Sequence, residues 1–346
     1  MSTETTDRSP RRRAAAATAG WCATLACATL GASALAGAPA GGGLRPGDLV
    51  VVDGLARETG ALLRVDPVTG AQSVLASGGR FDFPVAVAVE PAGTLLVLDL
   101  GPKEGPAEVI RVDPATGAQS VLSSGGAFDA PAGIAVGPDG RVYVADPGGF
   151  GKTGTVFRID PVTGAQSVFS TGGGFTDPAG LAVDRFGRLL VADYGDNGGT
   201  GSVLRLDPAT ATQSVLSAGS PLIDPYGVAL APDESIYVSD VGFGEKGEAA
   251  VFRVDPASGA VTVVSSAGDL FDPFGLAVGP DGSLFVADGD PDGGRILRID
   301  SVSGEQTILS EGGDLVLPFG IAVYVPEPAA VGLLLPAAIL LTRWRR

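Results

Sequence analysis

The sequence predicts an all-β fold in which copies of one unit close into a ring. The stretch RIDPVTGAQSVFSTGGGFTDPAGLAVDRFGRLLVAD, from Arg158 to Asp193, recurs with small changes along the chain. Each copy contains four short apolar runs separated by Gly, Pro and Asp, which favour turns. The copies follow one another at intervals of 45 to 48 residues. Four antiparallel strands in such a period are typical of a β-propeller blade.

Three landmarks occur six times each and therefore count six blades. One is an aspartate, followed by Pro or Ser, before the fourth strand of a copy: Asp66, Asp113, Asp160, Asp207, Asp255 and Asp300. Another is a proline at the first strand, two residues before a usual Gly: Pro84, Pro131, Pro178, Pro225, Pro273 and Pro318. The last is an aspartate that ends an apolar run: Asp53, Asp99, Asp146, Asp193, Asp240 and Asp288. The prediction is thus a six-bladed β-propeller.

One repeat shows how the strands are predicted. With the four strands named A to D, this repeat places A at residues 181–183, B at 189–193, C at 203–207 and D at 213–217. The turn between C and D usually reads Asp-Pro-x-Thr-Gly, in which Pro fixes φ and Gly supplies a positive φ.

The two ends of the repeat region predict how the ring closes. The region begins with a strand B, at residues 48–53, and finishes with a strand A, at residues 320–323. The C-terminal strand should therefore complete a blade whose other three strands come from the N-terminal side. This arrangement leaves no open seam between the first and last blades, so a closed ring is favoured over an open solenoid.

Composition excludes several functions. The chain has 39 acidic and 23 basic residues and a formal net charge of −16, and seven of its arginines lie near the two ends. A phosphate backbone would be repelled, so nucleic acid is not an expected partner. The chain has no histidine, and its two cysteines, Cys22 and Cys27, precede the repeats. Disulfides, thiolate metal sites and a cysteine nucleophile are therefore not expected in the propeller.

The N-terminal segment, residues 1–40, has the pattern of a signal peptide. Arg8 and Arg11 to Arg13 form a basic region, an apolar run from Ala14 to Leu35 follows, and Ala36-Gly37-Ala38 offers a small-x-small cleavage site. Export is therefore predicted, and we favour the general secretory route because only alanines directly follow the adjacent arginines. The propeller is assigned to residues 41–325.

The candidate site lies on one face of the predicted ring. Loops from B to C and from D to A share this face, while both chain ends leave from the other. Three aspartates, each directly before a strand A proline, are expected near the axis: Asp177, Asp224 and Asp272. Two acidic B-to-C loops share this face and contribute Asp196, Asn197, Asp290 and Asp292. Carboxylate and amide oxygens are ligands for hard cations, so calcium is the expected ion. For the six aspartates that end strand B, we expect capping of the local turn instead.

The repeat motif resembles a known family. Pro178-Ala179-Gly180-Leu181-Ala182-Val183, a Gly turn and then Val191-Ala192-Asp193 are similar to the NHL repeat, and the resemblance covers residues 48–323. It implies relatives that include lactonases of the gluconolactonase and regucalcin group and lyases resembling streptogramin lyase. The lactonases place a Glu near the first strand A, whereas residues 84–89 here contain no acid. The lyases rely on histidine, which this chain lacks.

The last segment, residues 326–346, resembles a second known module. Val325-Pro326-Glu327-Pro328, an apolar run from Ala329 to Thr342 and a final Arg343-Trp344-Arg345-Arg346 look like the PEP-CTERM sorting signal of bacteria that carry an exosortase. The resemblance implies exosortase-type sorting machinery as a partner and a membrane contact through the apolar run. An ordinary tail anchor is the alternative.

Together these features predict an exported binding or scaffold module without catalytic activity, located in the cell envelope, at the surface or in the extracellular matrix. An extracellular protein or a polysaccharide is the expected ligand. The alternative is a metal-dependent hydrolase, a lactonase or esterase, at the three axial aspartates. Without His or Cys, such an enzyme would use a carboxylate as its general base.

Overall fold

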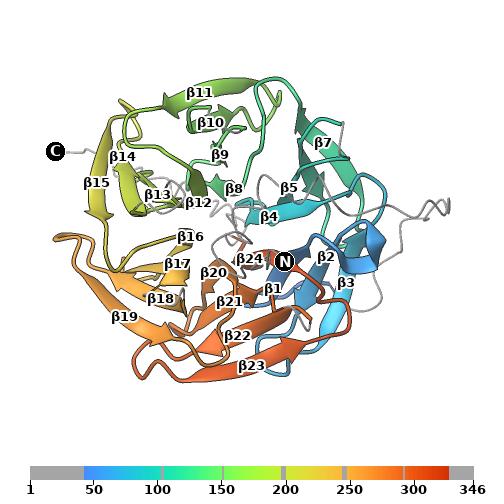
Figure 1. The fold of residues 1–346 in the computed structure, drawn as a ribbon. Coiled ribbons are helices and arrows are strands. Elements are labelled where there is room, and N and C mark those ends of the chain that lie inside the picture. The colour runs from blue at the N-terminus through green and yellow to red at the C-terminus, as the bar shows by residue number, and fades with distance from the viewer. Residues whose placement is uncertain are drawn as a thin grey trace, which may run out of the picture.

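The computed structural model describes residues 43–102, 105–149, 152–195, 200–243, 248–290 and 293–326. As predicted, these residues form an all-β, six-bladed propeller in which every blade is a four-stranded antiparallel sheet (Figure 1). Within the described ranges the only helix is a short 3-10 turn, η2 (Ala56–Glu58). None of the described residues forms a helix long and apolar enough to span a bilayer.

The blades follow the chain in order after the first. The first blade combines β24 (Pro318–Val323), β1 (Leu49–Asp53), β2 (Ala61–Val65) and β3 (Gln72–Ser77). The second contains β4 (Pro84–Val89), β5 (Leu95–Asp99), β6 (Glu108–Val112) and β7 (Gln119–Ser124). The third contains β8 (Gly133–Val136), β9 (Val142–Asp146), β10 (Thr155–Ile159) and β11 (Gln166–Thr171).

The remaining three blades repeat this pattern. The fourth contains β12 (Pro178–Val183), β13 (Leu189–Asp193), β14 (Ser202–Leu206) and β15 (Gln213–Ala218). The fifth contains β16 (Pro225–Leu230), β17 (Ile236–Phe243), β18 (Glu248–Val254) and β19 (Val261–Ser266). The sixth contains β20 (Pro273–Val278), β21 (Leu284–Asp288), β22 (Arg295–Ile299) and β23 (Gln306–Glu311). In the fourth blade, strand A starts three residues earlier than predicted and strand C one residue earlier.

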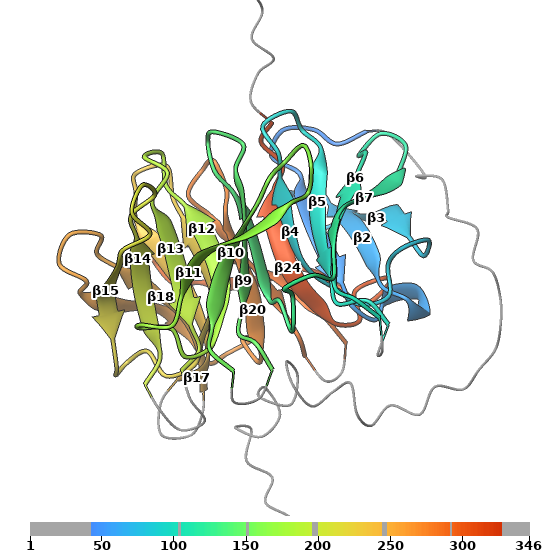
Figure 2. The same cartoon turned by 90° about the horizontal axis from the view of Figure 1, so that it is seen from above.

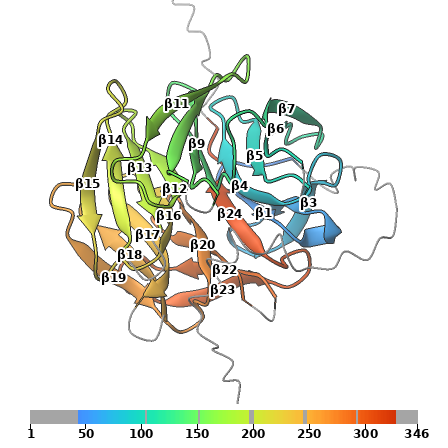
Figure 3. The same cartoon turned by 45° about the horizontal axis from the view of Figure 1, so that its top comes forward.

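The ring closes through the first blade, as the sequence predicts. β24 pairs antiparallel with β1, with Leu49 opposite Val323. The two ends are further joined where Gly47 N–H donates to the Tyr324 carbonyl at 2.9 Å and Tyr324 N–H donates to the Asp48 carbonyl at 2.7 Å. Both ends of the propeller therefore lie on the face of the A-to-B turns. Figure 3 shows β24 next to β1 and β4, and it contacts both strands.

Strand A of each blade lines the axis, and adjacent A strands contact one another around the ring. The recurring Gly of the Pro-x-Gly landmark explains this close contact. At Gly180 a Cβ would overlap the backbone carbonyl of Tyr226 in the next blade, and at Gly275 it would overlap that of Phe319. Glycine is needed here because two backbones approach each other directly.

A glutamine at the start of strand D links most blades to the preceding one. In the third blade, Gln166 donates from Nε2 to the Gly125 carbonyl and to Ser123 Oγ, while its Oε1 accepts the N–H of Ala127. The same glutamine link occurs at five junctions, through Gln72, Gln119, Gln166, Gln213 and Gln306. At the remaining junction, between the fourth and fifth blades, Val261 replaces the glutamine and Pro221, which has no N–H, replaces the donor. This junction therefore lacks both the glutamine side chain and the backbone N–H group that would donate to it.

The two faces of the ring carry different connections. A-to-B and C-to-D turns lie with the chain ends, and B-to-C and D-to-A connections lie on the opposite side, which we call the loop face (Figure 2 shows the blades edge-on). The C-to-D turns form as predicted. Asp160 Oδ1 accepts the N–H groups of Val162 and Thr163, and Gly164 has a φ of 70°.

Candidate functional site

The aspartates that end strand B hold the loop face together. They are buried, with exposed fractions of 0 to 2%: Asp53, Asp99, Asp146, Asp193, Asp240 and Asp288. In the fifth blade, Asp240 accepts the N–H groups of Ile223 and Asp224 from the D-to-A loop and that of Gly242 near the end of β17. The predicted capping role is confirmed in the first five blades. All six carboxylates also accept an N–H group from the loop that leads into strand A of their own blade.

Burial raises the pKa of these anchoring carboxylates despite the N–H groups that they accept. The pKa reaches about 6 for Asp99, Asp240 and Asp288. Desolvation is the largest cause, because a buried carboxylate loses its water and is favoured in the neutral form. Their burial and the backbone N–H groups that they accept indicate a structural role.

The sixth blade departs from this pattern. The buried Oδ1 of Asp288 accepts no hydrogen bond, whereas the equivalent oxygen accepts loop N–H groups in the other blades. Arg295 Nε lies 3.6 Å from this oxygen, and Arg295 also binds the Asp290 carboxylate. In this blade an arginine side chain thus lies within ion-pair distance of the carboxylate, without a hydrogen bond to this oxygen.

The three axial aspartates lie on the loop face, as predicted, each directly before a strand A. Their backbones are held by the anchors: Asp177 N–H donates to Asp193 at 3.1 Å and Asp224 N–H donates to Asp240 at 3.1 Å. Tyr194, partly buried in the B-to-C loop of the fourth blade, lies close enough for their charges to act on its phenol. Burial, followed by the charges of Asp224, Asp177, Asp240 and Asp272, raises the pKa of that phenol.

Asp177 is the most distinctive of these residues. Its side chain is partly buried, and no described residue donates a hydrogen bond to its carboxylate. Burial and the nearby Asp193 raise its pKa to about 6. The ionised form is therefore destabilised in the folded protein at neutral pH.

Aromatic rings close the axis below these carboxylates. The residues that follow the strand A prolines include Tyr226, Phe274 and Phe319; the ring centroids of Tyr226 and Phe274 are 5.2 Å apart and those of Phe274 and Phe319 are 4.9 Å apart. Phe83 packs on Phe319 at 5.5 Å. Gly54 leaves the space that the Phe83 and Phe319 rings occupy. We call this group of rings the aromatic floor.

Behind the floor the axial channel is narrow and apolar. Its volume is about 90 Å³, and it is lined by strand A residues such as Val85, Ile134 and Leu276. Pockets that enclose small-molecule ligands usually measure about 300–1,000 Å³. A ligand of that size therefore does not fit inside the ring.

The predicted cation site remains a prediction. Asp196, Asn197 and Asp292 lie outside the described residues, and Asp290 is paired with Arg295. Within the described ranges no group of three or more Asp or Glu side chains has the arrangement of a metal site. The calcium expectation therefore depends on loop residues on which the structure is silent.

Two exposed apolar residues complete the loop face. Phe271 is 44% exposed and Val316 is 42% exposed. They come directly before Asp272 and Leu317, in the D-to-A connections of adjacent blades. Sequence reasoning missed them, together with Tyr194 and the aromatic floor. The sequence did offer one signal for Phe271 and Val316: the two residues before each strand A proline differ from blade to blade, and variable positions on a repeated frame often bind ligands.

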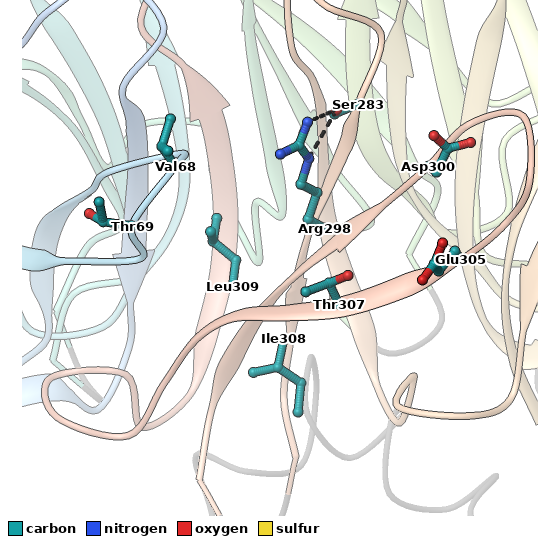
Figure 4. Close-up of a pocket in the computed structure, with 9 residues that line it drawn as sticks. All are labelled: Val68, Thr69, Ser283, Arg298, Asp300, Glu305, Thr307, Ile308 and Leu309. Carbon is teal, nitrogen blue, oxygen red and sulfur yellow. Dashed lines mark hydrogen bonds between the residues drawn. The ribbon is translucent and has the colours of Figure 1, made fainter.

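Shallow grooves at the rim are part of the repeated frame. One of about 470 Å³ lies between the last blade and the turn at Val68 and Thr69 of the first (Figure 4). Its Arg298 is already bound to Ser283 and Asp281. A groove of about 540 Å³ occupies the equivalent junction between the second and third blades. Because they recur at equivalent junctions, we assign these grooves to the architecture.

Comparisons with known proteins show the fold alone. The chain matches no protein-family model and no curated protein sequence. Among solved structures it is similar to nidogen in a nidogen–laminin complex, with a TM-score of 0.65 and 14% identity over 81% of this chain and 99% of that one. It is also similar to TolB from Acinetobacter baumannii, with a TM-score of 0.61 and 15% identity over 80% of this chain and 66% of that one. At such low identity these likenesses carry architecture and not activity.

Proposed function

We propose that this protein is an exported binding module whose loop face contacts an extracellular protein or polysaccharide. The observation that carries the proposal is the closed mouth of the axis. Acidic residues directly precede three of the six strand A prolines there, buried aromatic rings pack at the axis, and the channel measures only about 90 Å³. Such a surface suits contact with a large partner. Nidogen, a similar propeller, was crystallised with laminin, which is consistent with this kind of role.

The proposal includes the interpretation of the two ends. We assign the chain to NHL-like propellers with a signal peptide at residues 1–40 and a sorting signal at residues 326–346, handled by exosortase-type machinery. Because both ends of the propeller leave from one face, a C-terminal membrane segment would direct the loop face away from the membrane. Truncation after Val325 should release the protein into the medium, and retention in the envelope would contradict the assignment.

The binding face can be tested with single introduced cysteines, because residues 43–346 contain none. A polyethylene glycol chain attached to Thr176→Cys would cover the loop face, whereas the same chain on Ala92→Cys would cover the opposite face. Both positions are exposed. Capture of envelope and culture-fluid components from the source cells should be lost only with the Thr176→Cys conjugate. Equal capture by both conjugates would overturn the proposal.

A second candidate function, the metal-dependent lactonase or esterase, is favoured by one observation. The pKa of Asp177 is raised to about 6, in the range in which a carboxylate acts as a general base near neutral pH. Hydrolysis of a lactone and ester panel, in calcium and in EDTA, tests it. Turnover that disappears in Asp177→Asn and Asp224→Asn would establish the enzyme, and its absence in wild type would reject it.

A further inference from the structure

The six junctions between neighbouring blades are not equally bonded at the outer edge of the ring. At five of them, the first residue of strand D is a glutamine that donates to a carbonyl of the preceding blade. Between the fourth and fifth blades this residue is Val261, whose side chain forms no hydrogen bond. The outer strands of these two blades, β15 and β19, are therefore joined without the link.

The fourth blade has lost its side of the link as well. In the second blade, Gly126 lies so close to the link that a Cβ there would be 2.6 Å from Gln166 Oε1. Between the fourth and fifth blades, Ser220 replaces this glycine and Pro221, which has no N–H, replaces the donor that follows it. A conserved contact has thus been replaced on both sides of a single junction.

The repeated arginine of strand C is also held less firmly at this junction. In the second blade, Arg111 donates to both carboxylate oxygens of Glu90 and to a carbonyl of the next blade. In the fourth blade, Arg205 also donates to a carbonyl of the next blade, but its buried Nε has no acceptor among the described residues. The equivalent acid, Asp184, is bound by Arg188 instead. The hydrogen bond that Arg205 makes across the junction therefore lacks the acid that orients its counterpart.

The place where the two ends of the chain meet is bonded more densely. In the first blade, β24 pairs with β1, and Asp53 accepts two N–H groups of the connection that enters β24. At the junction with the sixth blade, the Gln72 link is present and Ser310 donates to the Gly70 carbonyl. The closing seam is therefore not the weak point of the ring.

The inner part of the junction between the fourth and fifth blades is closed like the others. Leu190 of the fourth blade packs with Val238 and Phe252 of the fifth in one buried cluster, and β12 contacts β16 at the axis. The turn at Gly259 lies against the Leu216 carbonyl of β15, as the equivalent turns of other blades do. Separation of the outer strands would therefore unpair no strand and leave the contacts at the axis in place.

We infer that the ring opens at the outer edge of the junction between the fourth and fifth blades, where β15 and β19 move apart while the strand A contacts persist. Proteins open locally where the fewest interactions have to be broken, and this junction has neither the glutamine link nor an acid on its arginine. A closed propeller thereby has one built-in position at which it can widen without releasing its closing strand. The inference goes beyond the proposed binding function and does not depend on it.

Two matched cysteine probes test the inference. Val254→Cys and Ile159→Cys each place a thiol at a fully buried position of strand C that pairs with the first residue of strand D, which is Val261 in the fifth blade and Gln166 in the third. In the full-length chain, with both natural cysteines changed to serine, the probe is the only thiol. Alkylation by iodoacetamide under native conditions, followed by mass spectrometry, measures how often each junction opens. We expect the fifth-blade probe to react at least tenfold faster than the third-blade probe.

Repair and removal of the link are the matched controls. Ser220→Gly, Pro221→Ala and Val261→Gln together give this junction the residues that the second and third blades have at the equivalent positions. They should slow alkylation of the fifth-blade probe about tenfold. Gln166→Ala should speed alkylation of the third-blade probe by a similar factor, because it removes three hydrogen bonds between the second and third blades.

Urea denaturation of each variant gives its free energy of unfolding, so alkylation through local opening is distinguished from alkylation through global unfolding. A fifth-blade probe that reacts only as fast as global unfolding allows would overturn the inference. Equal rates for the two probes in variants of equal stability, or a rate that the repaired junction leaves unchanged, would overturn it as well.

Discussion

The repeated frame of the propeller and the mouth of its axis follow opposite rules. The frame uses the same residue for the same contact in nearly every blade, as the anchoring aspartates and the glutamine links show. At the mouth, the position before the strand A proline is Asp in three blades and Phe, Ala or Leu in the others. Repetition therefore identifies structure, and departure from repetition identifies the candidate site.

The comparison also concerns stability. In the frame, a buried carboxylate such as that of Asp240 accepts several N–H groups, which offset the cost of its burial. At the mouth, Asp177 is partly buried without a described donor to its carboxylate, and its pKa is raised. Residues that lower stability concentrate where binding requires them. Mutations should therefore have opposite effects in the two regions.

Loss of an anchoring aspartate should give the largest effect. Asp240→Ala leaves the buried N–H groups of Ile223, Asp224 and Gly242 without their acceptor. With about 1–3 kcal/mol for each unsatisfied group, we expect a loss of roughly 4 kcal/mol in the free energy of unfolding. Urea denaturation measures it. The exposed Asp139→Ala serves as the control, and an equal midpoint for both variants would show that the anchors are dispensable.

A glutamine link should contribute less to the free energy of unfolding than an anchoring aspartate does. Gln166→Ala removes the hydrogen bonds to Gly125, Ser123 and Ala127, and we expect a loss of about 1–2 kcal/mol. The reverse change, Val261→Gln, should stabilise the protein by less than about 0.5 kcal/mol, because Pro221 offers no N–H to the new side chain. Urea midpoints of both variants test the pair. A gain for Val261→Gln as large as the loss for Gln166→Ala would contradict this account of the junction.

The frame could be predicted from the sequence because a repeat makes every signal visible six times. The turn aspartates, the strand A prolines and the closing strand were all found in this way. The glutamine links carried the same signal, since Gln72, Gln119, Gln166 and Gln213 recur at intervals of 47 residues, but their cross-blade contacts depend on a geometry that spacing alone does not give.

The mouth was harder to predict for the same reason. The three aspartates were found because they share a position, and their placement around the axis followed from the strand order. Tyr194, Phe271 and Val316 occur in one blade each, so no repetition marks them. Their significance comes from burial, exposure and neighbours, which only the folded chain defines.

At the mouth, the pH dependence of Tm should show how much the ionised Asp177 side chain destabilises the folded protein. Its pKa is about 6 in the folded state and 3.8 without burial, so the folded protein prefers the protonated form. The contribution of protonated Asp177 to the free energy of unfolding is complete below pH 3.8 and is lost as the pH rises through 6. Asp177→Asn should therefore raise Tm by a few degrees at pH 8, equivalent to roughly 1–3 kcal/mol, and leave it nearly unchanged at pH 4. Thermal melting at both pH values is the measurement, and a lower Tm for the variant at pH 8 would show that Asp177 supports the fold.

Calcium should produce the smallest effect that still distinguishes the two regions. The frame aspartates are committed to backbone N–H groups, so an ion can stabilise only the loop face, where the sequence predicts ligands from Asp196, Asn197, Asp290 and Asp292. A bound ion stabilises the folded state by mass action, and millimolar calcium above the dissociation constant should raise Tm by about 2–4 °C relative to EDTA. The ion has to compete with Arg295 for Asp290, which limits the gain. Asp292→Asn should abolish the rise and Asp139→Asn should preserve it. If Tm is the same in calcium and EDTA, the loop carboxylates hold no calcium, and the hydrolase hypothesis loses its metal.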